Sequence, residues 1–439
     1  MSKIRLLPQD DKTNGWSSFL PKRSPKPALN KDIFADFVVI GAGYAGLAAA
    51  RRLAELRPDA KIVVLDGQQL GEGSSGRNSG FAIDLPHNVG SSLQELAKGN
   101  AYLRLARAGI ASLRECVEKY KFDCDWSEDG KYHTASSERG AAEVLEPTIT
   151  MLKSLNEPFE WLDRKETARR LGTSHFAASI YTPGTVLLNP AAFNRGLGDN
   201  LPENVTLYEL SPVLEAHFSE TVVVKTANGT VRAPKAILTV NGFAMRFGFW
   251  KGKLLNFAAH ASLTHQLTES QQSALGNISS WGSTPANAFA GITMRYTNDR
   301  RILIRQNIHF CPGLRQSDER RNAIRKDHQR LFDERFPMLK GVAIEHTWTG
   351  YICLSRNGAP GFGKVAPNVW SAVCQNAVGV AKGTISGRLA AEMALGEDNQ
   401  LISDMLSLGT PSAVPPRPFL DMGVRARFAY ELFINQHEA

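Results

Sequence analysis

A glycine-rich turn between a buried strand and a helix constrains the fold of this chain more than any other feature. The apolar, β-branched run over residues 36–40 predicts a strand that is buried on both faces. The turn Gly41-Ala-Gly-Tyr-Ala-Gly46 follows it, and the alanine-rich stretch 47–56 predicts a helix. A second apolar strand over residues 61–66 completes a βαβ unit of about thirty residues.

The spacing of the three glycines matches GxGxxG, and each glycine has a mechanical role. Gly41 makes the tight turn, Gly43 lets the backbone approach a pyrophosphate, and Gly46 lets the helix pack close to the strand. The unpaired N–H groups at the helix N-terminus favour phosphate groups. Asp66 lies 20 residues after Gly46, where its carboxylate can accept hydrogen bonds from ribose hydroxyls. Together these features predict a dinucleotide-binding site.

A second GxGxxG match, Gly71-Glu-Gly-Ser-Ser-Gly76, follows Asp66 too closely to open another βαβ unit. No pattern of a helix followed by a strand comes after it. We therefore predict a flexible loop, rich in backbone and hydroxyl donors, just past the carboxyl end of the second strand. Ligands bind at that edge in sheets of this kind.

Composition and charge narrow the class of partner. Hydrophobic residues make up 43% and charged residues 21% of the 439 residues, which excludes a largely disordered chain. Lysine and arginine number 51 against 43 acidic residues, a net charge of +8. The basic residues are scattered among acids, so we expect a small anionic ligand and no nucleic acid.

Cysteine usage and hydropathy indicate the compartment. The five cysteines form no CxxC pair, so reduced thiols in the cytoplasm are expected. No apolar stretch near the N-terminus resembles a signal peptide, and the longest apolar run, residues 37–50, is too short to cross a membrane. No cluster has metal-ligand spacing, so no metal is expected. The oligomeric state is left open.

The loop after Asp66 carries a family resemblance. The fingerprint, the acid and then Ser74-Ser-Gly-Arg-Asn-Ser-Gly80 resemble the flavoprotein family of D-amino acid, glycine and sarcosine oxidases. The γ-glutamylputrescine oxidase-like branch of that family is the most similar. Further segments that match the family pattern are Asn189-Pro190, Trp348-Thr-Gly350, Asn357-Gly-Ala-Pro360 with Gly363, Gln375-Asn-Ala-Val-Gly379 and the helix that contains Gly387.

The resemblance implies an α/β fold of two interleaved domains. An FAD-binding Rossmann-like domain, of the glutathione-reductase type, would alternate along the chain with an α+β substrate domain built on a mixed antiparallel sheet. We assign residues 31–90, 185–257 and 350–415 to the FAD domain, and residues 91–184 and 258–349 to the substrate domain. Residues 1–30 would form an N-terminal arm and residues 416–439 a C-terminal tail.

The same resemblance implies FAD, bound noncovalently because Cys353 lies out of register with the family's attachment point. Gly41, Gly43 and Gly46 would hold the pyrophosphate, and Asp66 the adenosine ribose. The backbone of Val213 would meet the adenine, while the N–H groups of Gly379 and Val380 would face the flavin. The other cofactor-binding residues expected are Ala45, Ser75, Gly76, Arg77, Asn78, Ser79, Gly350 and Val378.

Two departures from the family pattern bear on the substrate. The family's GHG signature reads Ala377-Val378-Gly379 here, so no histidine is offered at that point. The carboxylate-binding arginine of glycine and D-amino acid oxidases falls at about Ile352. A primary α-amino acid bound in their manner is therefore disfavoured, and an amine with its carboxylate elsewhere, or a secondary amine, fits better.

Candidate substrate-binding residues lie in the substrate domain. Arg295, Tyr296 and Arg305 could pair with a substrate carboxylate or belong to a solvated strand face. Trp348 and Tyr351 could form an aromatic lid or part of the core. For His265 and His309 we expect structural roles, and for Lys382 a position in solvent.

The implied activity is oxidation of the C–N bond of a small amine or amino acid to an imine. Dioxygen would be the acceptor and hydrogen peroxide the product. We favour a carboxylate-bearing secondary amine, similar to sarcosine or iminodiacetate. The alternatives are a dehydrogenase that passes electrons to a quinone or partner subunit, a γ-glutamyl-polyamine oxidase, and a flavin-binding subunit without catalysis.

Overall fold

The computed structural model describes residues 2–86 and 98–438, and its six-stranded sheet carries the GxGxxG turn. Neighbouring strands are parallel except the last pair, β21 and β20. All residues of β3 and β4 are buried, as expected of apolar strands covered on both faces. In sheet order the strands are β10 (Val205–Tyr208), β4 (Ile62–Leu65), β3 (Phe37–Ile40), β14 (Lys235–Leu238), β21 (Val369–Val373) and β20 (Gly361–Ala366).

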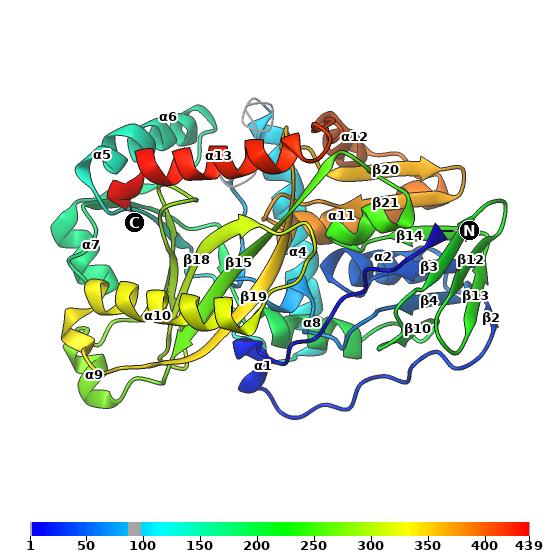
Figure 1. Cartoon of the computed structure of the whole chain (residues 1–439), viewed down its shortest axis with the longest axis horizontal. Coiled ribbons are helices and arrows are strands. Elements are labelled where there is room, and N and C mark those ends of the chain that lie inside the picture. Colours follow the sequence, from blue (N-terminus) through cyan, green and yellow to red (C-terminus); the bar gives the residue numbers. More distant parts are fainter. Residues whose placement is uncertain (1, 87–97, 439) are drawn as a thin grey trace.

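Helices cover one face of this sheet and a second sheet covers the other (Figure 1). Because successive side chains of a strand point to opposite faces, Val39 packs with the helices and Val38 with the second sheet. The helices are α2 (Tyr44–Leu56), α4 (Gly99–Tyr120) and α11 (Ala381–Leu395). The second sheet contains β1 (Ser2–Lys3), β11 (Glu215–Phe218), β12 (Val222–Lys225), β13 (Thr230–Ala233) and β2 (Ile33–Phe34).

An eight-stranded sheet forms the other half of the molecule. Its neighbouring strands are antiparallel except β16 and β6, which are parallel, so the sheet is mixed. Helix α10 (Asp318–Arg335) packs on its outer face against β15, β18 and β19. In order the strands are β19 (Ile344–Ser355), β15 (Leu254–Thr264), β18 (Ile302–Phe310), β17 (Thr293–Tyr296), β16 (Trp281–Pro285), β6 (Lys131–Ala135), β8 (Ala178–Thr182) and β7 (Glu160–Leu162).

Local sequence signals explain where several helices begin. Helix α8 (Pro190–Asp199) starts with proline, and the side-chain oxygen of Asn189 accepts hydrogen bonds from the N–H groups of Ala191 and Ala192. Ser317 caps α10 in the same way. The remaining elements are α1 (Gly15–Ser18), α5 (Glu138–Gly140), α6 (Glu146–Ser154), α7 (Arg164–Leu171), α9 (Glu269–Ala274), α12 (Gln400–Ser407), α13 (Phe419–Ile434), β5 (Phe81–Ala82) and β9 (Val186–Leu187).

The fold class expected from the sequence, an α/β dinucleotide fold joined to a mixed antiparallel sheet, is confirmed. The expected C-terminal tail contains a four-turn helix, α13. Of the helix expected from about residue 91, the part before residue 98 lies outside the described residues. In the described part of the chain, no helix is long and apolar enough to cross a membrane.

Candidate active site

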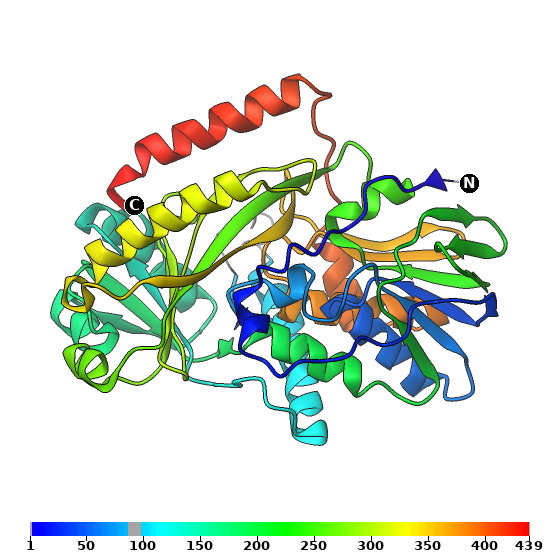
Figure 2. The ribbon, with the colours of Figure 1, turned by 60° about the horizontal axis from the view of Figure 1, so that its bottom comes forward.

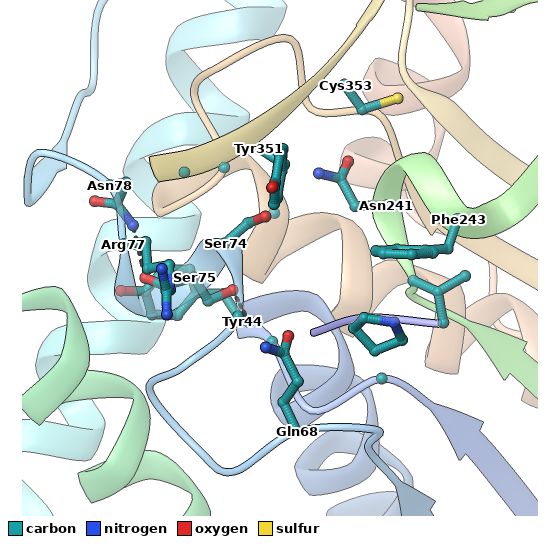
Figure 3. A pocket seen from close by; sticks show the side chains of 18 of the residues that line it. Tyr44, Gln68, Ser74, Ser75, Arg77, Asn78, Asn241, Phe243, Tyr351 and Cys353 are labelled. Carbon is teal, nitrogen blue, oxygen red and sulfur yellow. Dashed lines mark hydrogen bonds between the residues drawn. The ribbon is translucent and has the colours of Figure 1, made fainter. Parts of the chain in front are cut away.

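A cavity of about 340 Å³ lies where the six-stranded sheet meets the eight-stranded sheet. The GxGxxG turn and the segment after β4 form one wall, and residues of β15, β17, β18 and β19 form the opposite wall. Figure 3 shows side chains of the 73–79 loop on one side, with Asn241, Phe243 and Tyr351 across from them. The cavity is therefore at the carboxyl ends of the parallel strands, where open α/β sheets bind ligands.

The glycines of the first turn keep side chains away from this wall. Gly41 has a φ of +106°, in the region that favours glycine. A Cβ on Gly43 would lie 2.6 Å from Ser75 Oγ, and one on Gly46 would lie 1.8 Å from the carbonyl oxygen of Gly41. The turn thus leaves backbone N–H groups accessible to a ligand, and α2 starts directly against it.

The carboxyl group of Asp66 lies beside the turn at the end of β4. One oxygen accepts a hydrogen bond from the Ala42 N–H at 2.6 Å, and the other accepts from the Gln68 N–H at 2.8 Å. Loss of hydration raises the pKa of Asp66 to about 6, although these N–H groups act in the opposite direction. A carboxylate has about four acceptor positions, so Asp66 keeps capacity for ribose hydroxyls.

Asn194 of α8 joins the two glycine-rich turns, and sequence reasoning did not single it out. Its amide donates to the carbonyl of Ala42 at 3.1 Å and accepts from the N–H of Gly71 at 2.7 Å. A Cβ on Gly76 would lie 1.9 Å from the Gly71 carbonyl oxygen. The flexible loop predicted here is therefore wrong, because the segment is a tight turn held on both sides.

The loop after this turn lines the cavity with Ser75, Arg77, Asn78 and Ser79, while Gly76 is buried behind it. The Oγ of Ser75 accepts the Tyr44 N–H at 3.1 Å, and the amide of Asn78 donates to the Ser75 carbonyl at 2.6 Å. The Arg77 guanidinium is buried and paired with acidic side chains. Hydroxyl and backbone groups are therefore what this loop offers to a ligand.

The N-terminus of α11 forms another part of the wall. Gly379 and Val380 line the cavity, whereas Val378 is buried behind them. The preceding turn places Asn376 and Ala377 at φ values of +53° and +68°. Since the first N–H groups of a helix have no partner within it, this geometry directs donors toward the cavity.

Arg295 and Tyr296 of β17 do not line the cavity. Arg295 Nη1 donates to the carbonyls of Ser79, Gly80 and Leu188 at 3.1, 3.2 and 2.7 Å. Tyr296 is 2% exposed and packs in the core under α10. The structure therefore gives Arg295 a role in holding the loop, and neither residue contacts the space where a substrate would bind.

Arg305 of β18 faces the cavity, and its environment differs from that of Arg295. Its Nη2 donates to the Thr293 hydroxyl at 2.6 Å. Its Nη1 is buried and has no hydrogen-bond partner among the described residues. Burial lowers the pKa of Arg305 to about 10, so the guanidinium keeps its charge at neutral pH.

Of the two aromatic residues on β19 that were expected near the substrate, one lines the cavity and the other does not. Trp348 is fully buried, and its indole N–H donates to the Arg77 carbonyl at 3.0 Å. Tyr351 lines the cavity together with Gly350, and burial raises the pKa of Tyr351 to about 12. Trp348 is part of the core, whereas Tyr351 presents a neutral phenol to the cavity.

The two histidines and the lysine considered in the sequence analysis do not line the cavity. His309 stacks on His260 with ring centroids 5.3 Å apart, and the exposed His265 is 3.6 Å from Glu345. Lys382 is buried, with its ammonium 5.4 Å from the Tyr102 ring centroid. The expected solvent position of Lys382 is wrong because the first turn of α11 packs against α4.

Sequence reasoning missed several residues that line the cavity. The clearest are in the N-terminal arm, which contributes residues 4, 6–9 and 11. The run Ile4-Arg-Leu-Leu-Pro8 is an apolar signal within a segment that otherwise reads as polar. Others are Gln68, Asn241, Phe243, Thr293 and Ile308.

Comparison with known proteins places this geometry in a family. The model of the FAD-dependent oxidoreductase family (DAO) matches residues 36–393. The chain belongs to the DAO family of FAD-dependent oxidoreductases. It is an oxidoreductase with FAD as its cofactor.

Individual relatives share most of their length with this DAO-family chain. It is 26% identical over 423 residues to probable oxidoreductase OrdL of Haemophilus influenzae, covering 94% of both chains. It is 27% identical over 393 residues to gamma-glutamylputrescine oxidoreductase of Escherichia coli, covering 86% of this chain and 87% of that one. Glycine oxidase from Geobacillus kaustophilus has the same fold, with a TM-score of 0.70 at 19% identity over 87% and 100% of the two chains.

The cavity fits FAD by its chemistry. The side-chain-free turn at Gly43 suits a pyrophosphate, Asp66 suits a ribose, and the N-terminus of α11 suits the electron-rich edge of a flavin. When bound, FAD would supply the acceptor for the electron pair that is removed from the substrate. The residues of the cavity would bind and orient FAD and the substrate, and apolar side chains such as Phe243 would exclude water.

Proposed function

We propose that this enzyme oxidises small amines that carry a carboxylate, with secondary amines preferred, and that Arg305 binds the carboxylate. The observation that carries the proposal is the buried Nη1 of Arg305, which has no partner among the described residues on the cavity wall. A buried guanidinium without an acidic partner binds carboxylates well, because its planar fork matches two oxygens.

The position of Arg305 supports a binding mode different from that of glycine oxidases. Ile352, at the family's usual arginine position, lines the cavity and offers no charge. Arg305 comes from β18 instead, and Thr293 on the neighbouring strand orients it through the 2.6 Å hydrogen bond. A carboxylate held there would leave the amine to lie between this wall and the flavin.

The cysteines bear on how FAD is bound and on the cellular compartment. A hydrogen bond with Cys374 and burial raise the pKa of Cys353, so its thiol stays protonated and noncovalent FAD is favoured. The five free cysteines are all buried, in keeping with a reducing cytoplasm. We propose dioxygen as the acceptor, with hydrogen peroxide as the product.

A γ-glutamyl polyamine is the second candidate substrate, and the E. coli relative named for gamma-glutamylputrescine favours it. Its glutamyl group also carries a carboxylate that Arg305 could bind. The two candidates differ in length and in whether the reacting amine is primary or secondary.

The test is a peroxide assay of the purified flavoprotein in air, with sarcosine, iminodiacetate, γ-glutamylputrescine and primary D-amino acids. Turnover of the secondary amino acids supports the proposal, and turnover of γ-glutamylputrescine alone supports the second candidate. Activity only on primary D-amino acids would contradict both. Flavin reduction by substrate without peroxide would identify a dehydrogenase instead of an oxidase.

A further inference from the structure

The N-terminal arm passes over the cofactor cavity, although it lies outside the part of the chain that matches the family. The match begins at residue 36, whereas residues 4, 6–9 and 11 line the cavity. Figure 2 shows the arm, in dark blue, running along the molecule from the N-terminus to the short helix α1. We call residues 4–11 the strap.

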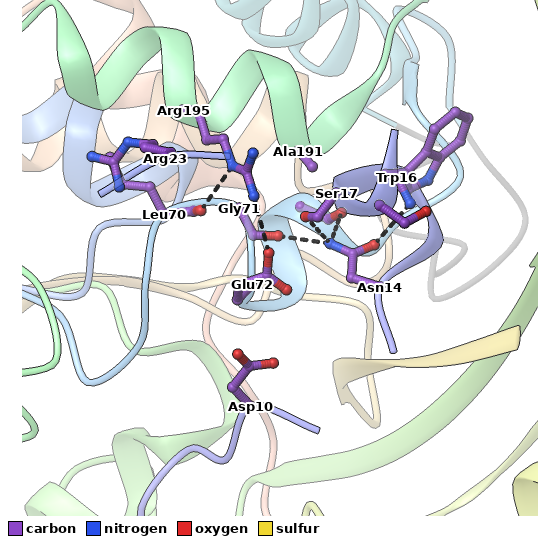
Figure 4. A network of polar contacts seen from close by, with 12 residues as sticks. Asp10, Asn14, Trp16, Ser17, Arg23, Leu70, Gly71, Glu72, Ala191 and Arg195 are labelled. Carbon is purple, nitrogen blue, oxygen red and sulfur yellow. Dashed lines mark hydrogen bonds and ion pairs between the residues drawn. The ribbon is translucent and has the colours of Figure 1, made fainter. Parts of the chain in front are cut away.

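Both ends of the strap are fixed to the body of the protein. Before it, β1 pairs with β11, and the Ile4 N–H donates to the Leu214 carbonyl at 2.8 Å. After it, the Asn14 amide donates to the carbonyls of Gly71 and Gly76 at 2.8 and 3.0 Å (Figure 4). The strap is therefore anchored at one end to the second sheet and at the other end to the second glycine-rich turn.

Apolar residues of the strap cover the end of the cavity near Asp66. A Cβ placed on Gly67 would lie 2.8 Å from Pro8 Cγ, which puts the two residues in contact. Ile4 is 6% exposed and belongs to the same core cluster as Val213. Asp66 and Val213 are the residues expected at the adenosine of FAD, so the strap lies over that half of the site.

Ion pairs join the last two residues of the strap to Arg77. Asp11 Oδ1 lies 2.7 Å from Arg77 Nη1, and Asp10 Oδ1 lies 3.2 Å from Arg77 Nη2. Asp11 also pairs with Arg321 of α10 at 3.3 Å. Burial opposes the charge of Asp11, yet the two arginines hold its pKa below the usual value, so the pairs are formed at neutral pH.

We propose that the strap encloses the adenosine half of FAD and that Asp10 and Asp11 latch it to Arg77, so that FAD leaves only when the strap opens. The strap thereby stabilises noncovalent FAD and joins the two halves of the molecule through Arg77 and Arg321. The inference depends on FAD as cofactor and is independent of the substrate.

The first test measures FAD affinity in the full-length double variant Asp10→Asn/Asp11→Asn. Deflavinated protein is titrated into FAD, and the dissociation constant is read from quenching of flavin fluorescence. We expect it to rise about tenfold, because three partly exposed ion pairs are lost, Asp10–Arg77, Asp11–Arg77 and Asp11–Arg321. Asp318→Asn is the matched control, since Asp318 also pairs with Arg321 but on an exposed side of α10. Its dissociation constant should stay within about twofold of wild type.

The second test uses the wild-type chain and needs no substitution. Arg5 lies within the strap and Lys12 directly follows it, and both are exposed, so trypsin can report opening of the strap. Because ligand binding and strap closure stabilise each other, FAD should slow cleavage after Arg5 about tenfold relative to the FAD-free protein. Equal cleavage rates with and without FAD, or an unchanged dissociation constant in the double variant, would overturn the proposal.

Discussion

Arg295 and Arg305 lie on the neighbouring strands β17 and β18, and burial lowers the pKa of each to about 10. Their hydrogen bonds differ. Arg295 Nη1 donates to three backbone carbonyls, whereas Arg305 has the Thr293 hydroxyl and a buried Nη1 without a partner among the described residues. Arg295 Nε also has no hydrogen-bond partner among the described residues, but Arg295 does not line the cavity, whereas Arg305 does. Because buried donors are usually satisfied, an unpartnered donor on the cavity wall marks Arg305 as the arginine that can take a ligand, and Arg295 as the one that holds the fold.

Substitution of Arg305 by methionine should give the largest effect. We expect kcat/KM for carboxylate-bearing amines to fall about 1,000-fold (about 4 kcal/mol), because the substrate carboxylate loses its charged partner. The free energy of unfolding should stay unchanged or rise, since an uncompensated buried charge is removed. Steady-state kinetics and thermal unfolding measure the two effects, and a large loss of stability with unchanged kcat/KM would reverse the assignment.

Substitution of Arg295 by methionine should give the opposite pattern. The carbonyls of Ser79, Gly80 and Leu188 would lose a shared donor, so we expect the free energy of unfolding to fall by about 3 kcal/mol. Urea unfolding of the FAD-free protein measures this loss. At a temperature where the variant is folded, its KM for the amine should stay within a few-fold of wild type.

Asp66 is, like Arg305, a buried charged residue whose expected partner is a ligand, in this case the cofactor. Asp66→Asn should weaken FAD binding about 30-fold (about 2 kcal/mol), because a charged acceptor for the ribose is lost. The pKa of about 6 in the folded, FAD-free protein exceeds the usual value near 4. The folded carboxyl therefore keeps its proton to a higher pH than the unfolded one, and its contribution to stability falls as pH rises from about 4 to about 6. Thermal unfolding of deflavinated wild type and variant should show this contribution only in wild type.

Thr293→Val should give the smallest effect and tests how Arg305 is positioned. The substitution removes the hydroxyl that accepts from Nη2 at 2.6 Å while keeping the shape of the side chain. We expect KM for the carboxylate-bearing amine to rise about fivefold (about 1 kcal/mol) with little change in kcat. Thr297→Val, directly after β17 and away from the cavity, is the control.

The two arginines also show which parts of this site the sequence could predict and which it could not. The βαβ unit and its glycines follow from local rules of turn geometry and hydrophobic periodicity, and the structure has these elements where the pattern placed them. The choice between Arg295 and Arg305 depends on carbonyls and cavity walls contributed by distant segments. No local pattern could distinguish two arginines that both lie on buried strands.

The N-terminal arm and the 71–76 turn show the same limit. The sequence predicts only an arm for residues 1–30 and a flexible loop for 71–76, because composition does not record the partners that hold these segments. Asn14 and Asn194, each far away in sequence, fix the second turn through hydrogen bonds. An amide side chain in an arm or a helix gives no sign of its partner until the fold brings the two together.

The central claim, that Arg305 binds the substrate carboxylate, is tested most directly by anaerobic reduction of the bound flavin. An amino acid that the enzyme oxidises and its neutral primary amide are each mixed with wild type and with Arg305→Met, and bleaching of the flavin absorbance is followed. The account predicts that wild type is reduced much faster by the acid than by the amide, and that the variant barely distinguishes them. Equal rates for the acid and the amide in wild type would contradict it.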